Sequence, residues 1–227
     1  MQITDIKKKG AIPVIAVIAI VFIDQLIKFA VKTNFCLHES VEITSWMYLL
    51  FVENSGMAFG MSFIGTMFLT IVRIALVVLL TLYLRQIVVN RFPRGYIICV
   101  SMVLAGALGN IIDNAFYGLI YSESTVFDVA ELVPFGEGYG SFMSGKVVDM
   151  FYFPIIETDI PAWIPFWGGN HFIFFSPVFN FADSSITCGA IAILIFYRKY
   201  LSSAKVLSRE SINKKSGNSE NKIKKDS

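Results

Sequence analysis

Long apolar blocks alternate with polar connections along this chain. Four blocks carry few charged residues and lie at about 11–32, 66–86, 95–117 and 178–199. An α-helix of about 20 apolar residues is long enough to cross the hydrocarbon core of a bilayer. Arg73 interrupts the second block near one end, where we expect its long side chain to extend to the membrane interface. The pattern predicts a mainly α membrane protein with four transmembrane helices.

The composition agrees with this prediction. Of the 227 residues, 55% are hydrophobic and the mean hydropathy is +0.64, whereas apolar residues make up about 45–50% of a typical soluble domain. The first apolar block has no small-residue cleavage pattern, so we expect a retained span and not a removed signal peptide. The three cysteines and two histidines lack the spacing of a disulfide framework or a metal site. We therefore expect no disulfide and no metal site. We also expect no cofactor and no nucleic-acid partner.

Basic residues are distributed unevenly around the four blocks. The N-terminal segment, the short connection after the second block and the C-terminal tail hold 15 of the 19 Lys and Arg residues. The two longer connections, at 33–65 and 118–177, hold ten acidic residues and a single Lys146. Because cytoplasmic segments carry an excess of Lys and Arg, we expect both termini to be cytoplasmic and both longer connections to lie outside.

The remaining organisation is simple. We expect one integral-membrane domain at 1–200 and a basic cytoplasmic tail at 201–227, whose many Lys, Ser and Asn residues favour disorder. The segment 37–61 alternates apolar and polar residues before a glycine-containing turn, which predicts a small outward-facing β element. The segment 151–177 is rich in aromatic residues and proline, which favours an interfacial insertion at the level of the lipid headgroups.

Polar residues interrupt three of the four apolar blocks in pairs three or four residues apart. These pairs are Asp24 with Lys28, Asn110 with Asp113, and Asn180 with Asp183. A charge near the bilayer centre costs about 2.5–3.5 kcal/mol, so it normally faces protein or water. The expected topology brings all three pairs to one level, near the outer boundary of the membrane. Solvation at helix ends or a structural salt bridge explains any one pair, but three pairs at one depth indicate a composite site.

Two further segments of the outer connections carry polar residues that have both an ordinary and a functional interpretation. Asn54 and Gly56 lie in FVENSGMAFGM, which is typical of a plain turn. Asp149 lies in GKVVDMFYFP, where a lone aspartate is usually a solvated surface charge. The small residues at 105–109 favour close packing of helix backbones, which would bring the polar faces of neighbouring helices together.

Five motifs in order resemble those of the bacterial lipoprotein signal peptidases, also called signal peptidase II. The motifs are DQLIK, ENSGMAFG, GALGNIID, GKVVDMF and FNFADSSI, and they extend from Asp24 to the end of the last apolar block. Each motif is short, but their order on four apolar blocks makes the resemblance specific. The resemblance implies an aspartic intramembrane endopeptidase of the bacterial inner membrane, with its active site near the periplasmic face.

The resemblance also implies substrates and residue roles. The family removes signal peptides from diacylglyceryl-modified prolipoproteins by cutting before the lipidated cysteine. The expected partners are therefore these prolipoproteins and membrane lipids, and we expect a monomer. By position, the catalytic pair falls on Asp149 and Asp183. The residues that bind substrate or support the site fall on Asp24, Lys28, Asn54, Gly56, Gly109, Asn110, Asp113, Asn180 and Ala182.

The chain departs from the family pattern in two places. The family usually has an arginine directly after the aspartate of the third-block motif, where this chain has Asn114, so the pairing made by that arginine is missing or is supplied by another group. The stretch 120–144 is an insertion, which we interpret as a lid, a partner surface or an inert elaboration.

Two other functions were compatible with intramembrane acids. A small proton-coupled transporter component would need polar residues at several depths, but the stretch LVVLLTLY offers none. A structural scaffold would leave the five motif matches as coincidence. The peptidase is therefore the preferred hypothesis.

Overall fold

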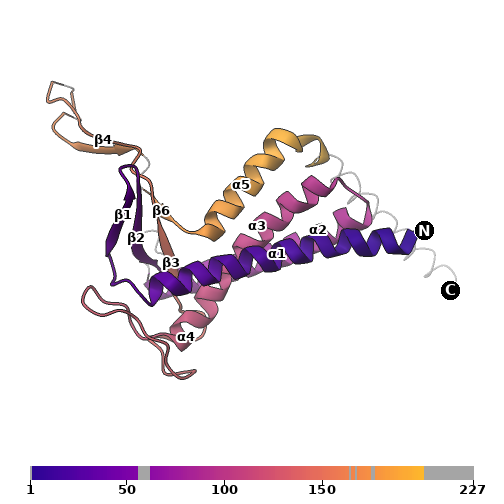
Figure 1. Cartoon of the computed structure of the whole chain (residues 1–227), viewed down its shortest axis with the longest axis horizontal. Coiled ribbons are helices and arrows are strands. Elements are labelled where there is room, and N and C mark those ends of the chain that lie inside the picture. Colours follow the sequence, from indigo (N-terminus) through magenta and orange to yellow (C-terminus); the bar gives the residue numbers. More distant parts are fainter. Residues whose placement is uncertain (1, 56–61, 164, 167, 175–176, 202–227) are drawn as a thin grey trace, which may run out of the picture.

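A computed structural model of the chain describes residues 2–55, 62–163, 165–166, 168–174 and 177–201. Helices form one end of the molecule and strands the other (Figure 1). The elements in order are α1 (Gln2–Lys32), β1 (Ser40–Thr44), β2 (Met47–Asn54), α2 (Ser62–Val89), α3 (Arg94–Ile112), the π-helical turn η1 (Asp113–Tyr117), α4 (Gly118–Ile120), β3 (Val147–Tyr152), β4 (Ile156–Asp159), β5 (His171–Phe174), β6 (Val178–Phe179) and α5 (Phe181–Phe196).

Three helical segments of the described chain are long and apolar enough to cross a membrane. They are Gly10–Lys32, Thr70–Val89 and Arg94–Ile120, which agree with the first three predicted blocks. α5 is apolar but has only 16 residues. The predicted start of the fourth block at Val178 was wrong for the helix, because Val178 and Phe179 pair with β3 and Asn180 caps the helix. The predicted disordered tail, 201–227, lies outside the described residues from position 202 onward.

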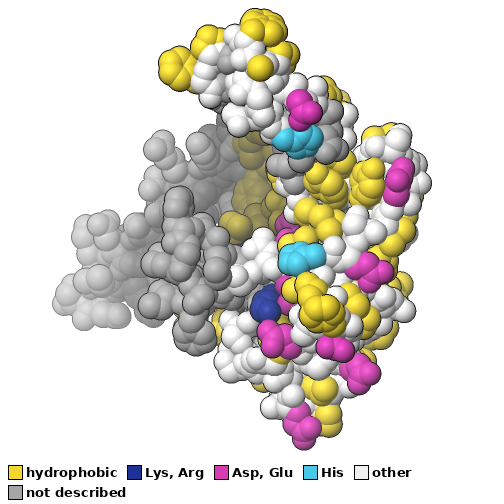
Figure 2. Space-filling model, turned by 90° about the vertical axis from the view of Figure 1, so that its left-hand side faces the viewer, with side chains coloured by type: hydrophobic (Ala, Val, Ile, Leu, Met, Phe, Trp, Pro, Cys, Tyr) yellow, Lys and Arg dark blue, Asp and Glu magenta, His cyan; other side chains and the backbone are white. Residues whose placement is uncertain are grey.

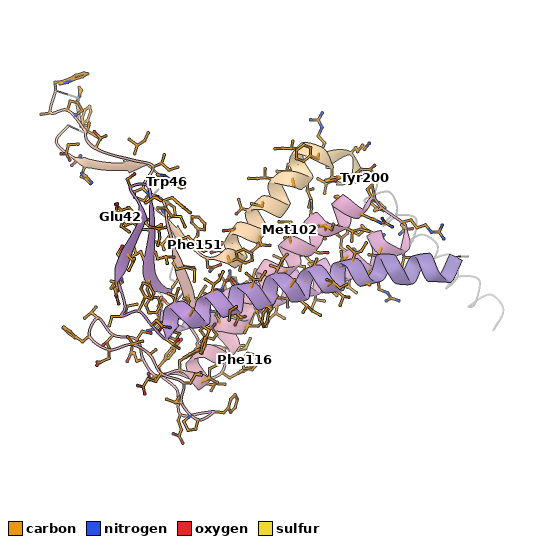
Figure 3. The ribbon with its side chains drawn as sticks, in the orientation of Figure 1. Glu42, Trp46, Met102, Phe116, Phe151 and Tyr200 are labelled. Atoms are coloured by element: carbon orange, nitrogen blue, oxygen red, sulfur yellow. The ribbon has the colours of Figure 1, made fainter. Side chains whose placement is uncertain are left out.

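α3 is the central helix and packs against α1, α2 and α5. Away from the strands, its start lies in an apolar cluster around the fully buried Tyr96. Farther along, α3 and α5 approach closely: a methyl group on Gly106 would overlap the backbone carbonyl oxygen of Ala182. Ser185 of α5 also donates a hydrogen bond of 3.2 Å to the carbonyl oxygen of Met102, which is labelled in Figure 3. The small residues of α3 thus permit the predicted close packing.

A four-stranded antiparallel sheet with the order β1-β2-β3-β6 forms the strand end of the molecule. The β element predicted from 37–61 is confirmed as β1 and β2. Two strands were not predicted: β3, which lies in the second long connection, and β6, which lies at the start of the fourth apolar block. Asp149 was assigned to a loop, but it lies on β3 directly opposite Val52 of β2. This pairing buries Asp149, whose side chain is 4% exposed.

Two insertions leave the strand end on opposite sides (Figure 1). Residues 118–146 form one, and residues 153–177 form the other, which contains the antiparallel pair β4 and β5. Figure 2 looks onto the strand end, where acidic side chains are common and basic ones are scarce. This distribution reflects the charge asymmetry of the two long connections in the sequence.

Candidate active site

One residue, Asn180, connects the two aspartates expected to be catalytic. Asn180 precedes α5 and donates a hydrogen bond of 2.7 Å from Nδ2 to Oδ1 of Asp149. Its Oδ1 accepts a hydrogen bond of 2.9 Å from the backbone N–H of Asp183. The Asp183 carboxylate in turn accepts from the backbone N–H of Asn180 at 3.4 Å, which completes a capping box. The helix cap therefore fixes Asp183 next to the strand residue Asp149.

Asn110 of α3 holds Asp183 from the other side. Its Nδ2 donates to Oδ1 of Asp183 at 2.9 Å. Its Oδ1 accepts from Nζ of Lys28 at 2.9 Å and from Nδ2 of Asn180 at 3.2 Å. Because a lysine ammonium can only donate, it requires the oxygen of this amide to face it, and the Nδ2 group is left to face Asp183. Lys28 thereby sets the orientation of the amide that contacts the carboxylate.

Asn54 ends β2 and donates from Nδ2 to Oδ2 of Asp149 at 3.4 Å. Asp149 therefore has an amide donor on each carboxyl oxygen, Asn180 on one and Asn54 on the other. Gly56, which the resemblance also assigned to the site, lies outside the described residues.

The surroundings of Asp149 favour its neutral form. Burial raises the pKa of this carboxyl to about 7, and the charge of the nearby Asp183 adds to the rise. The hydrogen bonds from Asn180 and Asn54 act in the opposite direction, because they stabilise the ionised form. A substantial fraction of Asp149 therefore keeps its proton at neutral pH, which suits a general acid.

Lys28, Asp24 and Asp113 form a buried ionic cluster, which contacts the site of Asp149 and Asp183 through Asn110. Nζ of Lys28 lies 3.0 Å from Oδ2 of Asp24 and 2.7 Å from Oδ2 of Asp113, and all three side chains are buried. Gln25 donates to Oδ1 of Asp113 at 2.9 Å. The other oxygen of Asp24 accepts from the backbone N–H of Ala182 at 2.9 Å. The cluster therefore ties α1 and α3 to the first turn of α5, which carries Asp183.

Gly109 makes room for this arrangement. A Cβ atom on Gly109 would lie 2.6 Å from Oδ2 of Asp24 and 3.3 Å from Cβ of Ala182. Any larger residue would push the Asp24 carboxylate away from α5. The role of Gly109 is thus to permit a close approach.

Arg73 contacts Asn114, the residue that stands where the family usually has an arginine. Its Nη1 donates to Oδ1 of Asn114 at 2.6 Å, and Nδ2 of Asn114 donates to the carbonyl oxygen of Gly145 at 2.7 Å. This contact gives the Arg73 side chain a hydrogen-bond acceptor within the protein, which was not predicted from the sequence. Gly145 lies two residues before β3, so this chain of contacts leads toward Asp149.

A second buried cation, Lys32, was not predicted from the sequence. It forms an ion pair with Glu53, which is adjacent to Asn54, and donates to Oγ of Ser124 at 2.9 Å. Lys146 pairs with the other oxygen of Glu53 at 3.2 Å. These contacts anchor the insertion 118–146 to α1 and β2. The sequence contains one indication of a role for Lys32, its position one helical turn after Lys28. Its partners Glu53 and Ser124, however, lie 21 and 92 residues away along the chain.

Most of the residues that the resemblance assigned to the site lie close together in the structure. Asp24, Lys28, Asn54, Gly109, Asn110, Asp113, Asn180 and Ala182 lie in or directly against one network with Asp149 and Asp183. In the part of the chain that the structure describes, no group of three or more His, Cys, Asp or Glu side chains is placed to hold a metal ion. The arrangement offers two carboxyl groups with amide donors, which can support acid–base chemistry.

Comparisons with known proteins identify the family of this chain. The family model described as signal peptidase (SPase) II matches residues 16–199. A protein of Porphyromonas gingivalis named lipoprotein signal peptidase is 43% identical over 195 residues, which are 86% of each chain. A protein of Amoebophilus asiaticus with the same name is 32% identical over 188 residues, which are 80% of this chain and 75% of that protein.

Two solved structures, each described as a bacterial membrane enzyme, share the fold with a TM-score of 0.54. The first is 23% identical and the match covers 84% of this chain and 90% of that chain. The second is 24% identical, with 81% and 90% covered. The likeness to these structures extends over most of the fold, and the family model covers every motif that carries the described network. The chain therefore belongs to the signal peptidase II family and is a peptidase.

Proposed function

We propose that this protein removes signal peptides from diacylglyceryl-modified prolipoproteins, and that Asp149 and Asp183 are its catalytic pair. Family membership and the names of the relatives from Porphyromonas gingivalis and Amoebophilus asiaticus support the reaction. The observation that carries the residue assignment is the Asn180 amide, which hydrogen-bonds both to the Asp149 carboxyl and to the backbone of Asp183.

The reaction we propose uses one proton shared between two carboxyl groups. Asp183 acts as the carboxylate that takes a proton from water while the water oxygen forms a bond to the scissile carbonyl carbon. Asp149, whose pKa is raised to about 7, donates a hydrogen bond to the developing oxyanion. When the carbon–nitrogen bond breaks, Asp149 gives its proton to the leaving amine. A proton then passes from Asp183 to Asp149, and the pair returns to its starting state.

The supporting residues act by position. Asn180 and Asn110 hold the two carboxyl groups, and Asn54 is close enough to orient the substrate backbone as well as Asp149. Lys28 and the two carboxylates that surround it lock α1 and α3 against α5. We propose that the cut precedes the lipidated cysteine because the acyl chains, lying among the apolar helices, bring that residue beside the pair.

We infer a four-span topology in the bacterial inner membrane. Both termini would be cytoplasmic and the strand end periplasmic, as the distribution of Lys and Arg favours. α5 is about 24 Å long at 1.5 Å per residue, so it would need local thinning of the bilayer or its flanking residues to complete the crossing. The peptidase domain would extend over 1–200 as a monomer, with lipids and prolipoproteins as its partners.

A cleavage assay with purified protein and a diacylglyceryl-modified precursor tests the proposal. Wild-type protein is expected to shorten the precursor, whereas Asp149→Asn and Asp183→Asn are expected to leave it intact although they fold. Asp128→Asn, an exposed aspartate on the insertion 118–146, is the matched control and is expected to retain activity. Normal turnover by Asp149→Asn would overturn the pair, and Asp113 would become the next candidate.

A second comparison tests the substrate class. A precursor without the diacylglyceryl group is expected to be cut poorly by the same enzyme preparation. Equal cleavage of the two precursors would contradict the proposed role of the acyl chains. The transporter alternative finds no support at the end of the bundle away from the strands, where the buried side chains form an apolar cluster around Tyr96.

A further inference from the structure

The insertion at residues 153–177, which we call the arm, forms a sheet of its own. β4 and β5 pair with each other and, among the described strands, are separate from the four-stranded sheet. The arm begins and ends where β3 pairs with β6, at the register pair Tyr152 and Val178. An isolated two-stranded hairpin is only marginally stable in water and usually needs an apolar surface to pack against. The arm is therefore expected to pack against an apolar surface outside the four-stranded sheet.

Stacked aromatic rings fix the base of the arm to the sheet. The ring of Phe153 lies 5.9 Å from that of Trp46 and 5.4 Å from that of Phe179. Phe179 also lies 6.0 Å from Phe151, on the strand that carries Asp149 (Figure 3). The arm leaves the sheet on the side of α5 (Figure 1). These ring contacts thus connect the base of the arm to the sheet.

The strand register divides the arm into two chemically different faces. Residues directly opposite each other in an antiparallel pair share a face, and successive residues alternate between faces. Ile156 pairs with Phe174 and Thr158 pairs with Phe172, so these four positions share one face. On the other face His171 is opposite Asp159, and Nδ1 of His171 and Oδ1 of Asp159 form an exposed hydrogen bond of 2.8 Å. By sequence, the positions of one face are therefore mainly apolar, and the other face is charged through Glu157 and Asp159 but also includes Ile173.

The tip of the arm is aromatic and exposed. Trp163 is 81% exposed and Phe166 is fully exposed. Hydrophobic side chains are visible at this tip, at the top of Figure 2. The whole arm contains no Lys or Arg. Exposed aromatic rings of this kind favour the headgroup level of a bilayer, whereas the absence of basic residues excludes attraction to anionic lipids as the driving force.

We propose that the arm docks on the membrane leaflet next to the strand end, with its apolar face and aromatic tip at the depth of the lipid headgroups. The open edges of a two-stranded sheet carry unpaired N–H and C=O groups, which cannot enter the hydrocarbon core. The headgroup level satisfies them with water while it covers the apolar face. The charged face, with Asp159 and His171, points away from the lipid. This inference does not depend on which carboxyl groups are catalytic.

Tryptophan fluorescence in proteoliposomes tests the proposal. Single-tryptophan variants of the full chain are prepared from Trp46→Phe/Trp163→Phe/Trp167→Phe by adding Thr158→Trp or, as the matched control on the opposite face, Asp159→Trp. A third variant keeps Trp163 as its only tryptophan. Each is reconstituted in phosphatidylcholine that carries bromine atoms near the glycerol end of the acyl chains, and is also titrated with aqueous iodide.

The arm is expected to give an alternating result. Brominated lipid should lower the emission of Trp163 and of the Thr158→Trp variant by about twofold, because interfacial residues lie within reach of these bromines. The Asp159→Trp variant should respond to iodide and not to brominated lipid. Replacing part of the phosphatidylcholine with phosphatidylglycerol should leave both responses unchanged. Iodide quenching of all three variants without quenching by brominated lipid would overturn the proposal, as would equal lipid quenching of the two faces.

Discussion

Asn180 combines two roles that can be separated by substitution. Its side chain caps α5 by accepting from the N–H of Asp183, and it donates to Asp149. Loss of an Asn cap costs about 1 kcal/mol, and leaving the other buried partners unsatisfied costs about 1–3 kcal/mol. We therefore expect Asn180→Ala to lower the free energy of unfolding by about 2–4 kcal/mol. The same substitution removes a hydrogen bond that stabilises ionised Asp149.

The pH profile of cleavage reports the second role. The amide of Asn180 lowers the pKa of Asp149, so its removal raises that pKa further above about 7. Because the proposed mechanism needs protonated Asp149, activity should persist to higher pH in the variant. A hydrogen bond to a carboxylate worth about 1.5 kcal/mol corresponds to an upward movement of the alkaline limb by about one pH unit. The maximal rate should fall, because the carboxyl group loses a fixed orientation.

Asn180→Ser is the matched control. Serine caps helices about as well as asparagine, but its shorter side chain cannot reach the Asp149 carboxyl group in the same way. The serine variant should therefore recover only the cap, about 1 kcal/mol of the stability that the alanine variant loses, while its alkaline limb moves as in the alanine variant. An alkaline limb that stays at the wild-type pH in both variants would refute the reasoning, since Asn180 would then not act on the proton of Asp149.

Three further substitutions test the structure around the site. Gly109→Ala should lower the melting temperature in detergent and the cleavage rate together, because its methyl group would collide with the Asp24 carboxylate; wild-type stability would contradict the close packing. Lys28→Met should cost about 3–5 kcal/mol of stability by leaving buried carboxylates unpaired, and the added change Asp113→Asn should recover part of this loss in the same unfolding assay. Arg73→Leu should lower the melting temperature, because it leaves the buried Asn114 without its charge-assisted hydrogen bond, and should lower kcat/KM by about tenfold if Arg73 also positions the site; unchanged kinetics would exclude a positioning role.

Local sequence pattern was sufficient for the first three helical blocks and for the polar pairs that lie on one helix. Bilayer thickness sets the length of an apolar helix, so the first three blocks were predicted with their approximate bounds. The pairs Asp24 with Lys28 and Asn180 with Asp183 are also local, because one turn of helix or one helix cap brings their members together. The β1 and β2 strands were predicted because alternation over a short segment is likewise a local signal.

The contacts between distant segments could not be predicted in this way. Arg73 was expected at the membrane interface because the sequence contains no sign that Asn114, 41 residues away, lies within its reach. Lys32 was overlooked for the same reason, since its partner Glu53 lies on a strand of the sheet. The predicted start of the last helix was wrong because the first two residues of this apolar block, Val178 and Phe179, pair with β3 as a strand.

The sequence by itself determined which side chains are too polar for lipid, and hence that this chain must gather them within the protein. Only the tertiary structure decided how they are gathered. Asp149 becomes a buried group with a raised pKa because β3 pairs with β2 and β6, which brings it to an amide 31 residues away along the chain. Desolvation and hydrogen bonding depend on neighbours in space, and a carboxyl group in a polar stretch of sequence therefore acquires its chemistry only when the sheet forms.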